Sequence, residues 1–271
     1  DARPQQKGLS RAQVVYEMLA EGGITRFMAL YSHDFPESLG PLRSARPYFV
    51  EFADQFKSLY LHAGGSDDAL KEINRNDRIL ALNGLVYEGI NYFVRDAKLA
   101  APHNLFVKGN DIIKALPVLK WKFDLSKPYF TFAEDFSANA EVFTANKIAI
   151  DFSFPEYKVD YVYDGPSHVY ERNMAGKPHV DKDAGQKIEP ANVGVIFTDY
   201  SVYDKDGRLD LRTTGKGDFW LFKDGKLQRG TWIRKAGSVM QFKDLNGVEM
   251  SFRPGQIFFE VINQKEKVTF S

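Results

Sequence analysis

The sequence feature that most constrains the fold is a change of texture near residue 127. Beyond it the chain consists of short runs, many of them alternating between apolar and polar residues. The sequences DKDG (204–207), KDGK (223–226) and DLNG (244–247) lie between such runs. An Asp-Gly or Asn-Gly step between two short runs of this kind is typical of a β-hairpin. We therefore predict that residues 126–271 form a mostly antiparallel β domain. The expected strands lie within 147–154, 158–164, 168–174, 192–200, 217–223, 226–235 and 256–262.

The first part of the chain contains longer segments, some with the pattern of helices and some with the pattern of strands. Ser10 is placed to cap a helix over 10–21, whose apolar face would contain Val15, Met18 and Leu19. Pro47 favours the first position of another helix. The alternation predicts an N-terminal α/β domain over residues 1–125, with helices packed on a sheet, and an α+β fold for the whole chain. The other expected elements are strands at 24–32 and 58–63, and helices at 47–56, 67–76 and within 101–119.

Composition excludes several classes of function. The 36 basic and 36 acidic residues balance, both overall and in each half, so we expect no nucleic-acid partner. The chain contains no cysteine, and therefore no thiolate metal site or cysteine nucleophile. No apolar run approaches the ~20 residues of a membrane span. The sequence HVDKDAG (179–185) is more typical of a turn than of a metal loop, and no nucleotide-binding motif is present. We expect neither a metal nor a cofactor.

Two arginines precede the helix expected at Pro47. Arg43 and Arg46 flank Ser44, and backbone N–H groups at a helix start favour an anion. A guanidinium binds a carboxylate or phosphate through two parallel hydrogen bonds, so this segment suits an acidic ligand. The alternative is that both arginines form internal ion pairs. The acids available for such pairs are Glu17, Glu21 and Asp96.

Glu17 and Glu21 are four residues apart, which would place them on one face of the expected helix, opposite its apolar stripe. An acid at the C-terminal end of a helix is unfavourable. Arg26 follows the Gly22-Gly23 turn closely, and we predict that it contacts Glu21.

Histidines provide the other candidate chemistry. His62 ends an expected strand and precedes Gly64-Gly65-Ser66, where a ligand could approach the backbone; the alternative is a turn in which Ser66 caps a helix. His103 and Asn104 follow Arg95 in a loop. Imidazole is suited to proton transfer near neutral pH, although a histidine in such a loop is more often structural.

Several segments resemble, in order and spacing, the YerB-like family of bacterial lipoproteins, a two-domain family of unknown function. They include GLSRAQVVYEMLAEGGITRFMALY (8–31), LGPLRSARPYFVEFA (39–53), LHAGGS (61–66) and VRDAKLAAPHN (94–104), with NVGVIF (192–197) and GKGDFWLFKDGKLQRGTW (215–232) in the second domain. The resemblance implies an exported protein, anchored to the membrane only through a lipid-modified N-terminal cysteine absent from this chain, which begins at Asp1. It implies no activity. The family's charged signature falls on Glu17, Glu21, Arg26, Arg43, Ser44, Arg46, His62, Ser66, Arg95, His103 and Asn104.

Three functions are compatible with these residues. The preferred hypothesis is an extracytoplasmic protein that binds an acidic cell-wall ligand. The second is a cell-wall hydrolase that uses Glu21 or His62 as general acid or base. The third is a non-catalytic envelope scaffold whose charged residues form an internal ion-pair network. The sequence alone does not decide whether the protein is an enzyme.

Overall fold

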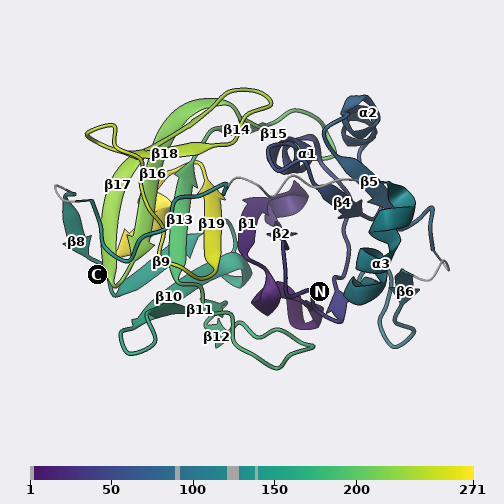
Figure 1. Ribbon diagram of the computed structural model, residues 1–271, viewed down its shortest axis with the longest axis horizontal. Coiled ribbons are helices and arrows are strands. Elements are labelled where there is room, and N and C mark those ends of the chain that lie inside the picture. Colours follow the sequence, from purple (N-terminus) through teal and green to yellow (C-terminus); the bar gives the residue numbers. More distant parts are fainter. Residues whose placement is uncertain (1–2, 89–91, 121–127, 138–139) are drawn as a thin grey trace. The chain divides into compact units, whose positions relative to one another are not determined.

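The computed structural model describes residues 3–88, 92–120, 128–137 and 140–271, and the chain divides into two compact units (Figure 1). Neither unit is a single continuous segment. The sequence predicted one boundary, between residues 125 and 126. That boundary would assign residues 12–30 to the first unit and residues 180–186 to the second. In the structure, residues 12–30 belong to unit 2 and residues 180–186 belong to unit 1. Unit 1 comprises Asp1–Arg11, Tyr31–Pro128 and Val180–Gln186; unit 2 comprises Ala12–Leu30, Tyr129–His179 and Lys187–Ser271.

Unit 2 is built from two sheets and a small hairpin. The strands of the larger sheet are β1 (Val14–Leu19), β2 (Thr25–Leu30), β8 (Val142–Thr144), β13 (Asn192–Phe197), β16 (Gly215–Lys223), β17 (Lys226–Arg234), β18 (Gln241–Asp244) and β19 (Ile257–Ile262). The second sheet contains β9 (Lys147–Asp151), β10 (Lys158–Asp164), β11 (Val169–Met174), β12 (Lys177–Pro178) and β20 (Val268–Phe270), and the hairpin pairs β14 (Tyr200–Val202) with β15 (Leu209–Leu211).

The strand order of the larger sheet is β18-β17-β16-β13-β19-β1-β2, with β8 paired to β17. Figure 1 shows its central strands β16, β13 and β19 side by side. The pairs β1–β19 and β13–β19 are parallel, and the other pairs of this sheet are antiparallel. The prediction of a mostly antiparallel β region is therefore confirmed, and each of the seven expected runs contains a strand.

Apolar residues cover both faces of β19. On one face Phe259 stacks on Tyr16 of β1, with ring centroids 4.7 Å apart, and lies 5.2 Å from Phe242 of β18. On the other face Phe258 lies near Tyr161 of β10, at 6.4 Å between ring centroids. The second sheet therefore packs against this face of the larger sheet, and burial of both faces forms the core of unit 2.

The prediction of a helix over residues 10–21 is wrong. The segment is strand β1, preceded by a short 3-10 helix at Leu9–Arg11 and followed by another at Glu21–Gly23. All six residues of β1 are buried because both of its edges are paired and both of its faces are covered. A strand buried on both faces has no polar alternation, so its apolar pattern also fits a helix. Ser10 consequently caps no helix there and donates its hydroxyl hydrogen to Asp181 at 2.8 Å.

Unit 1 contains the three α-helices of the described chain. The Pro47 helix, the strand ending at His62, the helix after Ser66 and the helix near residue 110 are all confirmed. The expected sheet covered by helices is instead two small sheets, ordered β3-β7-β6 and β4-β5, and the chain as a whole is mostly β. The helices and strands of unit 1 are β3 (Ser38–Leu39), α1 (Pro47–Asp54), β4 (Leu59–His62), α2 (Asp67–Arg75), β5 (Leu80–Asn83), β6 (Phe93–Arg95), β7 (Leu105–Lys108) and α3 (Gly109–Leu119).

Local chemistry explains the helix starts in unit 1. Pro47 occupies the first turn of α1 after Arg46, which is extended. The Ser66 hydroxyl accepts a hydrogen bond from Ala69 N at 3.3 Å and caps α2. The strands β4 and β5 pair in parallel on either side of α2 in the sequence, which makes a βαβ unit. Within the described residues, no helix is both long enough and apolar enough to cross a membrane.

Candidate functional site

Three loops of unit 1, which we call the convergent loops, lie side by side: residues 42–46, 62–66 and 103–105. They are far apart in the sequence but are joined by backbone hydrogen bonds. The bonds run from Ala63 N to Arg43 O (3.0 Å), Ala45 N to Gly64 O (2.9 Å), Ser66 N to Ala45 O (3.2 Å) and Leu42 N to Leu105 O (2.7 Å). The tertiary structure thus brings together three of the segments on which the family resemblance is based.

Arg43 and His103 contact each other directly within the convergent loops. The Nη1 atom of Arg43 donates to Nδ1 of His103 at 2.7 Å and to the carbonyl oxygen of Pro102 at 3.2 Å. A guanidinium can only donate, so His103 is the neutral tautomer with its proton on Nε2. Burial, and then the charge of Arg43, lowers the pKa of His103. Both partners of Arg43 are therefore uncharged.

A second cation lies next to Arg43. Arg46 is the N-cap residue of α1, and its Nη1 donates to the carbonyl oxygen of Ala45 at 2.8 Å. Burial, followed by the nearby charge of Arg46, lowers the pKa of Arg43. Ser44 lies between the two arginines and is half-buried. This edge of the convergent loops therefore concentrates positive charge at the start of a helix.

His62 is held in the interior of unit 1. Its side chain is buried, it stacks on Tyr60 at 5.5 Å, and its Nδ1 pairs with the carbonyl oxygen of Gly64 at 2.8 Å. Burial lowers the pKa of His62, and the Gly64 contact opposes that shift. The geometry gives His62 a structural contact within its own loop.

Arg95 and Asn104 form a separate contact. Arg95 donates to Asn104 Oδ1 at 2.7 Å and binds both carboxylate oxygens of Glu88. This arginine is consequently neutralised by an internal acid, in contrast to Arg43.

The remaining three residues predicted for the site lie in unit 2. Arg26 donates to Glu21 at 3.2 Å, so the predicted Glu21–Arg26 contact is confirmed. The expectation that Glu17 and Glu21 share one face of a helix is wrong, because Glu17 lies in β1, fully buried, and Glu21 lies in a 3-10 turn. Glu17 pairs with Arg172. Asp96, the third acid considered as a partner for the arginines, accepts from Lys98 N at 2.9 Å.

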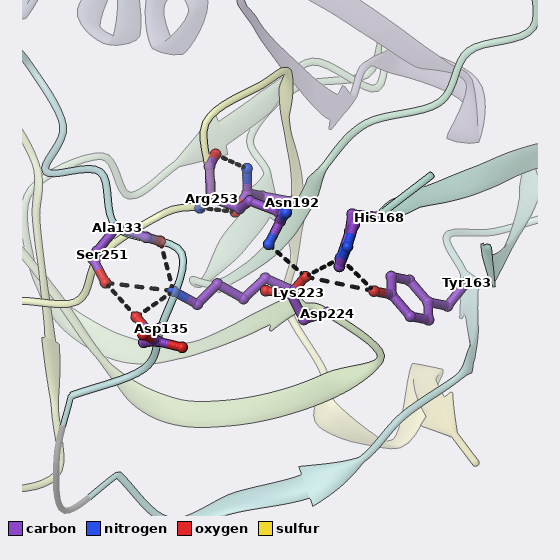
Figure 2. A network of polar contacts seen from close by, with 9 residues as sticks. All are labelled: Ala133, Asp135, Tyr163, His168, Asn192, Lys223, Asp224, Ser251 and Arg253. Carbon is purple, nitrogen blue, oxygen red and sulfur yellow. Dashed lines mark hydrogen bonds and ion pairs between the residues drawn. The ribbon is translucent and has the colours of Figure 1, made fainter. Parts of the chain in front are cut away.

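A second polar network, in unit 2, was not predicted. Asp224 occupies the β16–β17 turn with φ of 50°, and its Oδ1 accepts from Arg253 at 2.9 Å (Figure 2). The same oxygen lies 3.0 Å from His168 Nδ1 and 3.5 Å from the Tyr163 hydroxyl. The carboxylate therefore joins the turn of one sheet to the hairpin loop of the other.

Lys223, beside Asp224, makes the other part of the network in Figure 2. Its side chain is fully buried, and Nζ donates to the carbonyl oxygens of Ala133 (3.1 Å) and Asp135 (2.9 Å) and to the Ser251 hydroxyl (3.4 Å). Burial lowers the pKa of Lys223. A lone lysine in the apolar run DFWLFK was the sequence signal for this contact.

A hollow of about 230 Å³ lies in unit 1, and its lining includes none of the predicted site residues. It is lined by acids, including Asp34, Glu37 and Asp183, together with Arg11. Asp181, also in its lining, accepts from Gly8 N, Ser10 N and Ser10 Oγ, and so holds the N-terminal segment. Nowhere among the residues that the structure describes do three His, Asp or Glu side chains come together as a metal site would require.

Comparisons with known proteins identify a family in two separate matches to the chain. Residues 1–122 match the family described as "Protein of unknown function (DUF3048) N-terminal domain", and residues 148–259 match the corresponding C-terminal domain. The chain is 31% identical over 276 residues to "Putative lipoprotein YerB" of Bacillus subtilis (strain 168), covering 100% of this chain and 80% of that protein. The crystal structure of the Bacillus subtilis YerB protein superposes with a TM-score of 0.86 at 28% identity, covering 100% of this chain and 89% of that one.

Proposed function

The chain belongs to the DUF3048 family, and from this membership we propose that it is the extracytoplasmic part of a lipid-anchored bacterial envelope protein that binds an acidic cell-wall ligand. The name of the Bacillus relative supports the lipid anchor. The convergent loops of unit 1 are the binding surface in this proposal.

The observation that carries the proposal is the state of Arg43. Across residues 3–88, 92–120, 128–137 and 140–271, no carboxylate lies within ion-pair distance of its guanidinium, which is half-buried. Its neighbours are a carbonyl, a neutral imidazole and the like charge of Arg46. A partly desolvated cation in these surroundings is stabilised by an anion from outside the chain.

The free edge of Arg43 defines the chemistry of the ligand. The two hydrogen bonds that its side chain makes within the described part of the chain both come from Nη1. The Nε and Nη2 atoms form the edge that can donate two parallel hydrogen bonds to a carboxylate or a phosphate. Arg46, whose charge acts on Arg43, and the start of α1 add positive potential nearby. A peptide carboxylate or an anionic glycan of the cell wall fits this arrangement.

A hydrolase that uses Glu21 or His62 has less support. Glu21 is engaged by Arg26, and His62 is buried with its Nδ1 on Gly64. A general acid or base must reach the labile bond of the substrate, and neither side chain is presented for this.

Calorimetry with purified peptidoglycan fragments tests the proposal. We expect the intact protein to bind and Arg43→Ala to lose at least tenfold in affinity, because the bidentate contact is removed. Arg11→Ala is the matched control: it removes one arginine from unit 1 whose charge is already paired with Asp34 at 2.7 Å. Equal binding by wild type and Arg43→Ala would overturn the role of Arg43. An absence of binding by the wild type would favour the scaffold hypothesis.

A further inference from the structure

We infer that Glu17 and Glu260, in the core of unit 2, bind one proton between them and form a buried proton-binding site. The inference concerns side chains of unit 2, whereas the convergent loops belong to unit 1, and it is independent of the proposed function.

The strand register places the two glutamates next to each other. Parallel strands β1 and β19 pair with Glu17 directly opposite Glu260, which puts both side chains on the same face of the sheet. Their flanking register partners on this face are Phe27 of β2 and Val195 of β13, both apolar. Each glutamate has 0% exposure and is the only charged residue of its strand. Water therefore cannot solvate either carboxyl group.

Each glutamate has one satisfied oxygen. Arg172 Nη2 donates to Oε2 of Glu17, and the hydroxyl of Tyr161 donates to Oε1 of Glu260. Arg172 Nε also donates to the Tyr161 oxygen at 3.1 Å and lies 3.8 Å from Glu260 Oε1. The other two oxygens, Oε1 of Glu17 and Oε2 of Glu260, have no hydrogen-bond partner among the described residues. Unsatisfied buried oxygens are costly, and a carboxylate has no hydrogen with which to pair them.

The charges of the surrounding groups also require a proton. Among the residues that the structure describes, the cation that faces the pair is Arg172, which is itself 1% exposed. His179 accepts from Arg172 Nη1 at 2.6 Å and is therefore neutral; burial and Arg172 lower its pKa. Burial raises the pKa of Tyr161, which stays protonated. Two ionised glutamates would leave a net negative charge in the interior.

One shared proton pairs the two unsatisfied oxygens and removes the net negative charge. Placed on either unsatisfied oxygen, it donates to the other, so the pair becomes a carboxyl group hydrogen-bonded to a carboxylate. The cluster then carries one negative charge on the pair and one positive charge on Arg172. Burial, followed by the charge of Glu17, raises the pKa of Glu260 well above its usual range. Because the two groups interact strongly, the proton belongs to the pair and not to one residue.

The sign of the pH dependence follows from this binding. In the unfolded chain both glutamates have an ordinary pKa of about 4.3. Between that value and the raised pKa of the folded pair, the folded state holds one more proton than the unfolded state. Rising pH therefore lowers stability, by a factor of ten in the unfolding constant per pH unit, until the pH passes the folded pKa.

Infrared spectroscopy of the intact chain tests the inference directly. With ¹³C-labelled glutamate, the folded wild type at pH 7 is expected to show the C=O stretching band of a protonated carboxyl group, and Glu260→Gln to lack it. Glutamine keeps the size of the side chain and can donate to Glu17, so this variant imitates the protonated pair. Glu171→Gln, which changes a partly exposed glutamate of β11 paired with Lys187, is expected to keep the band.

Denaturant unfolding between pH 5 and pH 9 gives the second readout. The stability of the wild type relative to Glu260→Gln is expected to fall as the pH rises to the folded pKa, because the wild type loses the stabilisation of the shared proton. Contributions from the histidines are common to both proteins and cancel in this difference. A wild-type spectrum at pH 7 without a protonated carboxyl band would overturn the inference, and this result does not depend on whether any variant folds.

Discussion

Arg43 Nη1 donates to Nδ1 of His103 at 2.7 Å, so a cation and a neutral imidazole share one hydrogen bond in the convergent loops. Protonation of His103 would place two positive charges against each other. We predict that His103 titrates below the ordinary histidine range and that Arg43→Gln raises its pKa, since the charge of Arg43, the second-largest cause of the shift after burial, is removed. Histidine NMR titration measures both values, with His33, an exposed histidine, as the internal control. An unchanged His103 pKa in Arg43→Gln would show that the charge of Arg43 does not contribute to the shift.

The buried glutamate pair predicts non-additive substitutions. Glu17→Gln and Glu260→Gln each leave one carboxylate to neutralise Arg172, so each single variant is expected to lose about 1 kcal/mol or less at pH 7. The double variant leaves Arg172 as an uncompensated buried cation, and its loss is expected to exceed the sum of the single losses by about 3 kcal/mol. Urea unfolding of the four proteins measures the coupling. Additive losses would contradict the view that the pair carries a single negative charge.

Lys223→Met is expected to destabilise the protein by about 3 kcal/mol, because it leaves the carbonyl oxygens of Ala133 and Asp135 without their donor. Met resembles Lys in length, so the effect reports the lost hydrogen bonds more than lost volume. Lys216→Met, on an exposed position of the same strand, is the control and is expected to change stability by less than about 0.5 kcal/mol. Equal effects would show that the buried ammonium group contributes little.

Asp224 combines a charge with a left-handed backbone, and two substitutions separate these properties. Asp224→Asn removes the ion pair with Arg253 but tolerates the positive φ, so we expect a loss of about 1 kcal/mol. Asp224→Ala is expected to lose about 1 kcal/mol more, because alanine is disfavoured in the left-handed region. Thermal or denaturant unfolding of both variants gives the difference. If the two variants were equally stable, backbone strain at this turn would be negligible.

Local signals were sufficient for much of the fold. Alternating runs and Asp-Gly or Asn-Gly turns predicted the strands of the second half, because hairpin pairing depends on neighbouring residues. Pro47 and Ser66 marked the starts of α1 and α2 for the same reason. The Glu21–Arg26 contact, five residues apart, could also be predicted from spacing.

The positions of the site residues required the tertiary structure. Spacing could not show that Arg43 and His103, 60 residues apart, form a hydrogen bond. It also could not show that Glu17 belongs to unit 2, since its partner in the parallel register, Glu260, lies near the other end of the chain.

The sequence by itself determined which segments form hairpins and where two helices of unit 1 begin, because turn chemistry and helix capping act over a few residues. Only the tertiary structure decided that residues 14–19 form a strand, since an apolar segment buried on both faces carries no period that distinguishes a strand from a helix. The same burial places Glu17 beside Glu260, where the loss of water makes a shared proton the stable state.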